Sequence, residues 1–324
     1  MRRKDHRSDT MTKNIKNIGI FFIILLILFT SFITIVNGKN NLNNDNFQNV
    51  EKITNNTLFQ PTENLNPKQD VSEINDITKN YWAVLIGLND YPGDINDLPY
   101  SINEITSFQK TLLNTRNWKQ SNIKIITDND ATNSSFINAI KWLDENEDSN
   151  DLSIFYFAGH GSRNSNGHEY IKLYDAQITD EELDKQLDNL EGKVIVILDS
   201  CKSGGFIEEL HQNKRVILTA CSKEELAYQD HNLQSGIFGY FLNISLDKLA
   251  KSAEMAFLFT YPLCVYYSKK ISEQYHANFT FHPTKDDSNI GLSKIITWRK
   301  FLPISSGFLT YFKIKSSESK IWIL

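Results

Sequence analysis

Two apolar segments of the sequence end in residues that can carry out nucleophilic catalysis. The segment LSIFYFAGHG brings His160 to its end, and KVIVILDSCKSGG brings Cys201 to the end of a second apolar run. A free thiol has a pKa of about 8.5, so an imidazole that accepts its proton makes it a better nucleophile at neutral pH. The same imidazole can later protonate a leaving amine. The sequence therefore predicts Cys201 as a nucleophile and His160 as its general base.

The residue after the histidine suits the stabilisation of a transition state. Gly161 permits a tight backbone turn, so its N–H can point at a substrate carbonyl together with the N–H of Cys201. Removal of one such donor typically lowers turnover by about 10²- to 10³-fold. We predict that the backbones of Gly161 and Cys201 form an oxyanion hole.

The elements that must position these residues follow from the hydrophobic pattern. Short apolar runs alternate with amphipathic stretches, which is typical of an α/β fold with a largely parallel sheet. In such sheets the crevice outside the carboxyl ends of the strands is the usual ligand site. The expected strands cover residues 82–88, 123–126, 152–158, 194–198 and 216–218.

Several segments resemble the caspase, metacaspase and legumain group of cysteine peptidases, and the motifs are most similar to those of metacaspase-like domains. YFAGHG precedes LDSCKSGG by about forty residues, and further similar segments are AVLIGLNDYPGDINDLPYSINEITSFQKTLL, DNDATNSSFINAIKWL, RVILTACSKEELAY and SGIFGYFL. The resemblance covers residues 82–291. It implies a caspase-haemoglobinase fold, in which helices flank both faces of a mostly parallel central sheet. It also implies peptide-bond hydrolysis that needs no cofactor for its chemistry.

The residues expected around the substrate's P1 side chain are acidic. The sequence DSCKSGG lacks the caspase pentapeptide and is closer to the metacaspase and legumain pattern. Asp199 lies two residues before Cys201, and Glu104 stands where metacaspases carry an aspartate. With Ala158, these residues predict a P1 pocket that selects Arg or Lys. Two structural roles remain open: Asp199 could cap a helix or its own turn, and Glu104 is favourable in a first helical turn.

Two other functions share this fold. The first is a transamidase, as one membrane-anchored legumain relative is, and the second is a catalytically silent binding module. The interval from Cys201 to Val216 is short, so it leaves little room for the interdomain linker that caspases cut. We therefore expect activity as a single chain.

Metal sites have little support in the sequence. The histidines lack a cysteine or carboxylate at ligand spacing, so no metal ligands are predicted. Calcium activation, known in some metacaspases, has only the acidic positions Asp175, Asp180, Glu181 and Glu182 to draw on. Such a stretch also suits a solvated helix start. Cys221 and Cys264 are expected in the core.

The N-terminal region carries a targeting signal. Basic residues precede an uncharged apolar run over 18–36, which is close to the length of about 20 residues that spans a membrane. We predict a signal-anchor or a signal peptide over 1–36, a polar Asn-rich linker over 37–79, a peptidase domain over 80–292 and a tail of unknown role over 293–324. The protein is then membrane-anchored facing outward, or secreted.

The charge balance limits the class of partner. The formal net charge of the 324 residues is -5, so the chain lacks the electrostatic basis for general binding to phosphate backbones. Nucleic acid is not an expected partner. A polypeptide substrate is, together with a membrane contacted through residues 18–36.

Overall fold

A six-stranded sheet forms the centre of the domain. The computed structural model describes residues 79–93, 96–288, 293–297 and 320–324. The strand order is β11-β8-β7-β3-β1-β2, in which neighbours are parallel except for the antiparallel edge strand β11. The strands are β1 (Tyr81–Gly87), β2 (Ile123–Thr127), β3 (Leu152–Ala158), β7 (Lys193–Asp199), β8 (Arg215–Thr219) and β11 (Thr284–Asp287).

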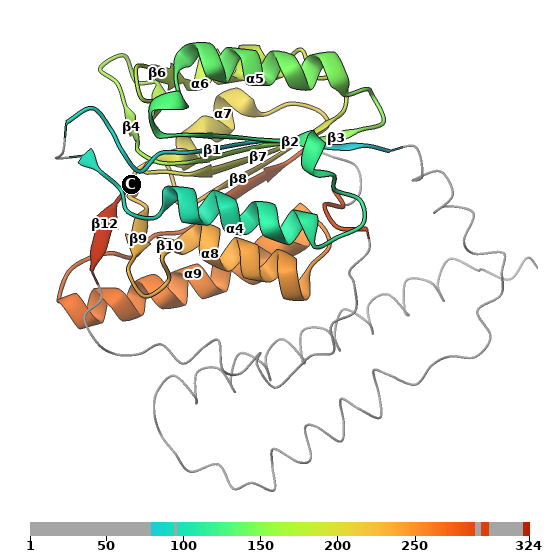
Figure 1. The fold of residues 1–324 in the computed structure, drawn as a ribbon. Coiled ribbons are helices and arrows are strands. Elements are labelled where there is room, and N and C mark those ends of the chain that lie inside the picture. The colour runs from blue at the N-terminus through green and yellow to red at the C-terminus, as the bar shows by residue number, and fades with distance from the viewer. Residues whose placement is uncertain (1–78, 94–95, 289–292, 298–319) are drawn as a thin grey trace, which may run out of the picture. The chain divides into compact units, whose positions relative to one another are not determined.

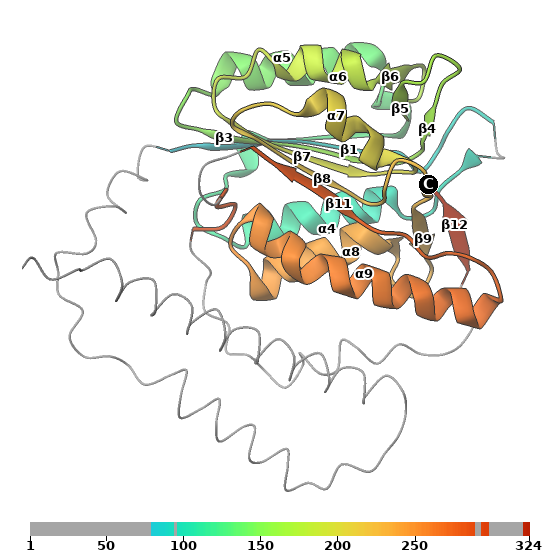
Figure 2. The ribbon, with the colours of Figure 1, turned by 180° about the vertical axis from the view of Figure 1, so that it is seen from behind.

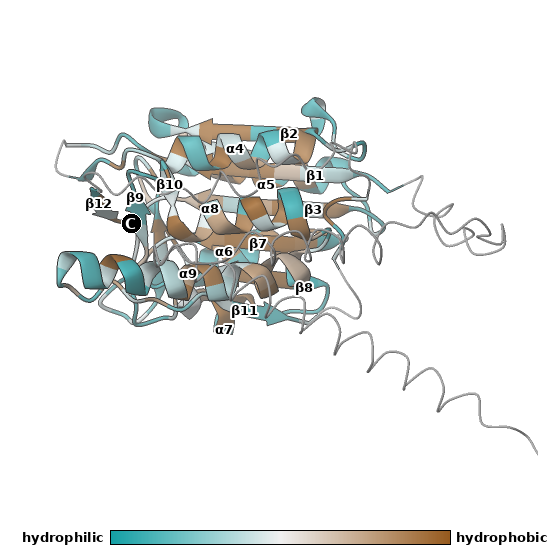
Figure 3. Ribbon diagram, turned by 90° about the horizontal axis from the view of Figure 1, so that it is seen from below, coloured by the Kyte–Doolittle hydropathy of each residue, from teal (hydrophilic) through white to brown (hydrophobic). Residues whose placement is uncertain are grey.

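The central strands are apolar because both faces of the sheet are covered. All seven residues of β3 are buried, and Figure 3 shows hydrophobic colouring along β1, β3 and β7. Parallel strands buried on both faces are read in a sequence as continuous apolar runs. The five predicted strands are present, each within one or two residues of its expected bounds.

Helices cover the sheet on both faces, as Figures 1 and 2 show. On one face lie α5 (Asn133–Asn146), α6 (Asp180–Leu187) and α7 (Phe206–Leu210), and on the other lie α4 (Ser101–Leu113), α8 (Ile237–Ile244) and α9 (Ala253–Tyr275). The buried side of α4 carries Ile105, Phe108 and Leu112 at three- and four-residue spacing. This arrangement confirms the predicted fold class.

Short helical turns connect the main elements. They are η3 (Gln120–Asn122), η4 (Asp128–Asp130), η5 (Ser203–Gly205) and the π-helical turn η6 (Ser245–Leu249), which continues α8. Thr179 caps α6, because its hydroxyl accepts the Glu182 N–H and the Glu182 carboxylate accepts the Thr179 N–H.

Two three-stranded sheets flank the central one. The first consists of β4 (Gly161–Arg163), β5 (Glu169–Lys172) and β6 (Gln177–Thr179). The second has the order β10-β9-β12 and joins β9 (Tyr228–Asp230) and β10 (Ser235–Gly236) to β12 (Ile321–Ile323). The last strand comes from the predicted tail. It lies beside β9 in both views of the ribbon (Figures 1 and 2).

Residues beyond the predicted end of the peptidase domain at 292 also contact it. The indole N–H of Trp118 donates to the Ile295 carbonyl at 2.8 Å. The predicted anchor or signal segment, 1–36, lies outside the described residues, as does the linker up to residue 78. In the part of the chain that the structure describes, no helix has the length and apolar character needed to cross a membrane.

Candidate active site

The register of two neighbouring strands brings His160 and Cys201 to one edge of the sheet. Ala158 at the end of β3 is paired with Asp199 at the end of β7, and His160 and Cys201 each follow two residues later. The Gly159 N–H donates to the Asp199 carbonyl at 3.2 Å, which holds the two strand ends together beyond their last paired residues. Both reactive side chains therefore leave the sheet at the same point.

Gly161 packs directly against the loop that carries the cysteine. A Cβ atom at position 161 would lie 2.7 Å from the Cys201 carbonyl oxygen and 2.6 Å from the Ser200 hydroxyl oxygen. Only glycine permits this approach without a shift of the backbone. The roles of the Gly161 and Cys201 N–H groups as an oxyanion hole remain a prediction.

Backbone and aromatic contacts orient His160. Its ring Nε2 donates to the Asn96 carbonyl at 2.7 Å, and the backbone of Leu324 also hydrogen-bonds the ring. The backbone N–H of His160 donates to the Tyr91 hydroxyl at 2.9 Å, and the ring centroids of these two residues lie 4.8 Å apart. Burial lowers the pKa of His160, so the imidazole is neutral near pH 7 and can accept a proton.

The Cys201 thiol is buried in a pocket of backbone groups. The Sγ atom donates to the Ala227 carbonyl at 3.6 Å and accepts the Ala227 N–H at 3.3 Å. Burial raises the pKa of Cys201 to about 12. Within the described residues, no hydrogen bond joins the thiol to the His160 ring. The two groups therefore share an edge of the sheet, and the roles of Cys201 as nucleophile and His160 as base remain a prediction.

Asp199 and Glu104 form a buried carboxyl pair at the N-terminus of α8. Glu104 accepts hydrogen bonds from the Tyr156 hydroxyl at 2.7 Å and from the Gly236 N–H at 2.6 Å. Asp199 Oδ2 accepts the Gly239 N–H at 2.8 Å. The two carboxyl groups also hydrogen-bond each other. Asp199 thus contributes to capping a helix, but that helix is α8 and not the one that follows it in sequence.

Burial perturbs both carboxyl groups of this pair. Burial and the charge of Glu104 raise the pKa of Asp199 well above its usual value, and burial raises the pKa of Glu104. Glu104 has more hydrogen-bond donors around it than Asp199 has, and these donors oppose the rise of its pKa. Asp199 Oδ1 is buried without a hydrogen-bond partner. Ala158 lies beside Asp199 on the neighbouring strand. The assignment of these residues to a P1 pocket remains a prediction.

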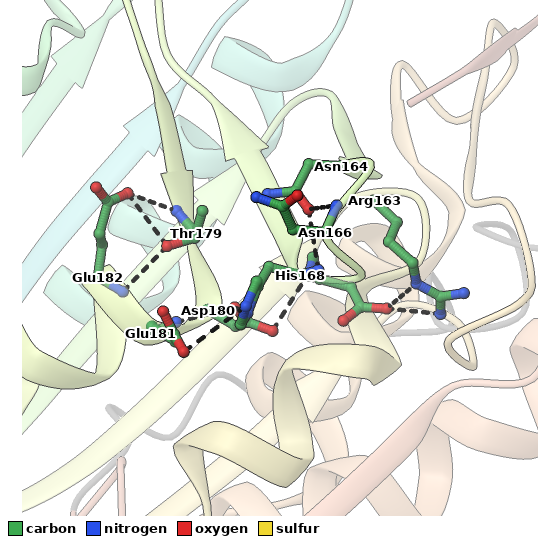
Figure 4. Close-up of polar contacts among 9 residues, drawn as sticks. Arg163, Asn164, Asn166, His168, Thr179, Asp180, Glu181 and Glu182 are labelled. Atoms are coloured by element: carbon green, nitrogen blue, oxygen red, sulfur yellow. Dashed lines mark hydrogen bonds and ion pairs between the residues drawn. The ribbon is translucent and has the colours of Figure 1, made fainter.

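The acidic stretch considered for calcium is engaged by protein groups. His168 Nδ1 bonds Asp180 Oδ1 at 3.0 Å, and the two Asp180 oxygens also accept the backbone N–H groups of Glu181 and Glu169. Arg163 lies against the Glu169 carboxylate, as Figure 4 shows. Over the described residues, no group of three or more His, Cys, Asp or Glu side chains is placed to hold a metal ion. Asp180 thus has protein partners on both oxygens in this structure, and calcium activation remains a prediction.

Four contact residues of the site were not predicted from the sequence: Tyr91, Asn96, Ala227 and Leu324. The signal for Tyr91 is its position in NDYPG, directly after the first strand, where a loop reaches the same edge of the sheet. Asn96, Ala227 and Leu324 act through backbone atoms. A backbone contact carries no residue-type signal, so sequence reasoning could not find them.

The caspase domain model matches residues 80–261 of this chain. The chain belongs to the caspase domain family. Among curated relatives, Metacaspase-8 of Arabidopsis thaliana is 29% identical over 192 residues, which cover 52% of this chain and 50% of the relative. Metacaspase-4 of Arabidopsis thaliana is 28% identical over 176 residues, or 49% of this chain and 41% of the relative. Metacaspase-1 of Schizosaccharomyces pombe is 27% identical over 147 residues, or 39% and 34%.

These matches confirm the resemblance read from the motifs. The chain spans half the length, or less, of these three relatives. Among solved structures, protein GSU0716 from Geobacter sulfurreducens aligns over 68% of this chain and 98% of its own, at 14% identity and a TM-score of 0.49.

Proposed function

We propose that this caspase-family chain is a cysteine endopeptidase with Cys201 as nucleophile and His160 as general base. The pairing of Ala158 with Asp199 carries the proposal, because it brings both reactive residues to the carboxyl edge of neighbouring parallel strands. Membership of a family whose curated relatives are metacaspases supports a cysteine peptidase.

The proposed reaction follows from the groups at this edge. His160 accepts the thiol proton as Cys201 Sγ attacks the substrate carbonyl carbon, and the resulting oxyanion accepts the N–H groups of Gly161 and Cys201. Collapse of the tetrahedral intermediate breaks the C–N bond, and His160 donates its proton to the leaving amine. Water, deprotonated by His160, then attacks the thioester and releases the acid. No cofactor enters these steps.

We assign the enzyme a preference for Arg or Lys at P1. Asp199 lies two residues before the nucleophile in sequence and forms a buried carboxyl pair with Glu104. The Asp199 Oδ1 atom is buried without a hydrogen-bond partner, so it can accept from a cationic side chain that enters the site. A guanidinium or ammonium group would supply the positive charge that compensates the two carboxyl groups. An acidic P1 side chain would face a carboxylate and is disfavoured.

The cellular setting is also part of this proposal. Basic residues before the apolar segment 18–36 support an outward-facing or secreted enzyme that acts on extracytoplasmic polypeptides. Activation by calcium remains a prediction. It requires the carboxylates near Asp180 to exchange their present partners for the ion.

Hydrolysis of matched fluorogenic peptides ending in Arg, Lys, Asp or Asn tests the proposal. We would compare the full chain with Cys201→Ala and with Cys264→Ala, a matched loss of a buried thiol on α9. Each assay is repeated with calcium, with chelator, and on a chain without residues 320–324, because Leu324 contacts His160. Cleavage after Arg or Lys that disappears only in Cys201→Ala is expected.

The other outcomes separate the alternatives. Cleavage after Asp or Asn would support the peptidase proposal but contradict the role of Asp199 and Glu104 in P1 selection. A Cys201-dependent product that forms only with an added amine would indicate a transamidase. If neither form of the chain turns over any substrate, and Cys201 resists substrate-like chloromethyl ketones, the peptidase proposal is wrong and a binding module takes its place.

A further inference from the structure

The strand β12 lies along the free edge of β9 as an added antiparallel strand. Ile321, Trp322 and Ile323 pair with Asp230, Gln229 and Tyr228. The ladder extends by one bond at each end, from the His231 N–H to the Lys320 carbonyl and from the Leu324 N–H to the Ala227 carbonyl, both at 3.0 Å. Addition of a strand to an exposed sheet edge is a recurrent mode of peptide binding.

Leu324, the residue that follows β12, contacts groups at both catalytic candidates. Leu324 hydrogen-bonds Ala227, and Ala227 in turn holds the Cys201 thiol through both its N–H and its carbonyl. The backbone of Leu324 also bonds the His160 ring. Leu324 is 3% exposed. A single residue of the segment therefore contacts the base and the backbone group that holds the nucleophile.

Side chains alternate along the segment, as expected for a strand with one face on the protein. Trp322 packs edge-on against Tyr100, with ring centroids 5.4 Å apart, and Leu324, two residues later, is buried. Ile323 points the other way and is 52% exposed. Trp322 and Leu324 thus anchor the segment, and Ile323 contributes little beyond its backbone.

We propose that residues 320–324 bind in the substrate cleft as a strand that keeps the active site latent. This inference rests on the proposed function. Three observations support it: the ladder on β9, the contact of Leu324 with His160, and the bonding of the Ala227 backbone to both Leu324 and the Cys201 thiol. The occupant is this chain's own hydrophobic segment, and a peptide substrate must displace it from the same edge.

The chemistry of the cleft explains why the segment is an effective competitor. A strand on β9 is bound through main-chain hydrogen bonds, which any extended peptide can form, and specificity comes from alternate side chains. A segment of the same chain binds this edge in an intramolecular step, which favours it over a free peptide. Release of the segment removes the bonds of Leu324 to the His160 ring and to the Ala227 carbonyl, the group that also holds the Cys201 thiol.

The rate of Cys201 alkylation tests the inference without requiring peptidase activity. Full chain, a chain lacking residues 320–324, Trp322→Ala and Ile323→Ala are treated with iodoacetamide, and modification at Cys201 is followed by mass spectrometry. Cys264, buried in α9, reports any general unfolding. We expect alkylation of Cys201 to rise at least tenfold in the deletion and in Trp322→Ala, and to change less than twofold in Ile323→Ala.

A peptide added in trans provides a second measurement. The peptide Lys-Ile-Trp-Ile-Leu, matching 320–324, should slow alkylation of the deleted chain, whereas Lys-Ile-Ala-Ile-Leu should not. Equal alkylation rates in the full and deleted chains, or no protection by the peptide, would overturn the inference. If Cys264 reacts in the Trp322→Ala protein, that variant has lost its fold, and the deletion with added peptide decides.

The two proposals fail in distinguishable ways. If alkylation of Cys201 rises on deletion of residues 320–324 but neither chain cleaves a peptide, the inference of a latent strand stands and the peptidase proposal is wrong. If Cys201-dependent cleavage is equally fast with and without residues 320–324, and the rate of alkylation is unchanged, the peptidase proposal stands and the inference of a latent strand is wrong.

Discussion

Asp199→Asn should remove a pH-dependent loss of stability. In the folded protein, burial and Glu104 raise the pKa of Asp199 well above its usual value, so the folded protein keeps this carboxyl protonated to a higher pH than the unfolded chain does. An asparagine has nearly the same shape as the protonated side chain, and its amide N–H can donate to Glu104 as the acid does. The substitution therefore retains the contact and removes the titration.

The sign follows from the protons bound in each state. Unfolded Asp has a pKa of about 3.9, so above this pH the folded protein holds a proton that the unfolded chain has released. The contribution of this bound proton to the free energy of unfolding is fully present below about pH 4. It is lost as the pH rises toward the pKa of Asp199 in the folded protein. The slope is about 1.4 kcal/mol per pH unit for one proton. Glu104 has a raised pKa as well and adds to the slope in the same direction.

Urea unfolding followed by tryptophan fluorescence at pH 4, 5, 6, 7 and 8 measures this effect. At pH 4 the variant should lie within about 1 kcal/mol of wild type. Its advantage over wild type should then grow by roughly 1.4 kcal/mol per pH unit until Asp199 ionises in the folded protein. Asp90→Asn, at an exposed carboxylate, is the matched control and should show no such trend.

Glu104→Gln tests the other member of the pair. Glutamine replaces a carboxyl group that accepts the Tyr156 hydroxyl and the Gly236 N–H, and its NH2 group cannot accept a hydrogen bond from either of them. We expect a loss of about 1–3 kcal/mol at pH 4, and this loss should become smaller as pH rises because the substitution also removes the Glu104 titration. The reasoning is refuted if the free-energy difference between Asp199→Asn and wild type stays constant from pH 5 to 8.

Three further substitutions test the support of the site. Tyr91→Phe leaves the backbone N–H of His160 without its acceptor, so the free energy of unfolding should fall by about 1–3 kcal/mol. In the peptidase assay kcat should fall with KM nearly unchanged, and an unaltered kcat would exclude Tyr91 as a positioning residue. Gly161→Ala places a Cβ atom against Ser200, so the free energy of unfolding measured in urea should fall by about 1–3 kcal/mol. An unfolding midpoint equal to that of wild type would contradict the close approach of Gly161 to Ser200. Thr179→Ala removes a helix cap and should lower the free energy of unfolding by about 0.5–2 kcal/mol, with peptidase activity unchanged; a loss of activity at full stability would show that this helix start has another role.

The sequence alone determined five of the six strands of the central sheet and the place of His160 and Cys201 at its edge; the antiparallel edge strand β11 was not predicted. Strands β3 and β7 are continuous apolar runs, which is the pattern expected of strands that are buried on both faces. His160 and Cys201 follow those runs directly, so the parallel arrangement of the two strands is enough to bring both residues to the same edge. The acidic stretch that suits a helix start does begin α6, where the local bonds between Thr179 and Glu182 form a capping box.

The tertiary structure decided which groups touch at that edge. The raised pKa values of Asp199 and Glu104 depend on burial and, for Asp199, on the facing carboxyl group, and these carboxyl groups reach the N-terminus of α8 only when the sheet and helices pack. Likewise, the pairing of β12 with β9 joins residues near 322 to residues near 229 through backbone bonds. A strand of three residues has too little periodicity to be read from the sequence, and main-chain hydrogen bonds do not depend on residue type. Only the folded chain could show that Leu324 lies beside His160.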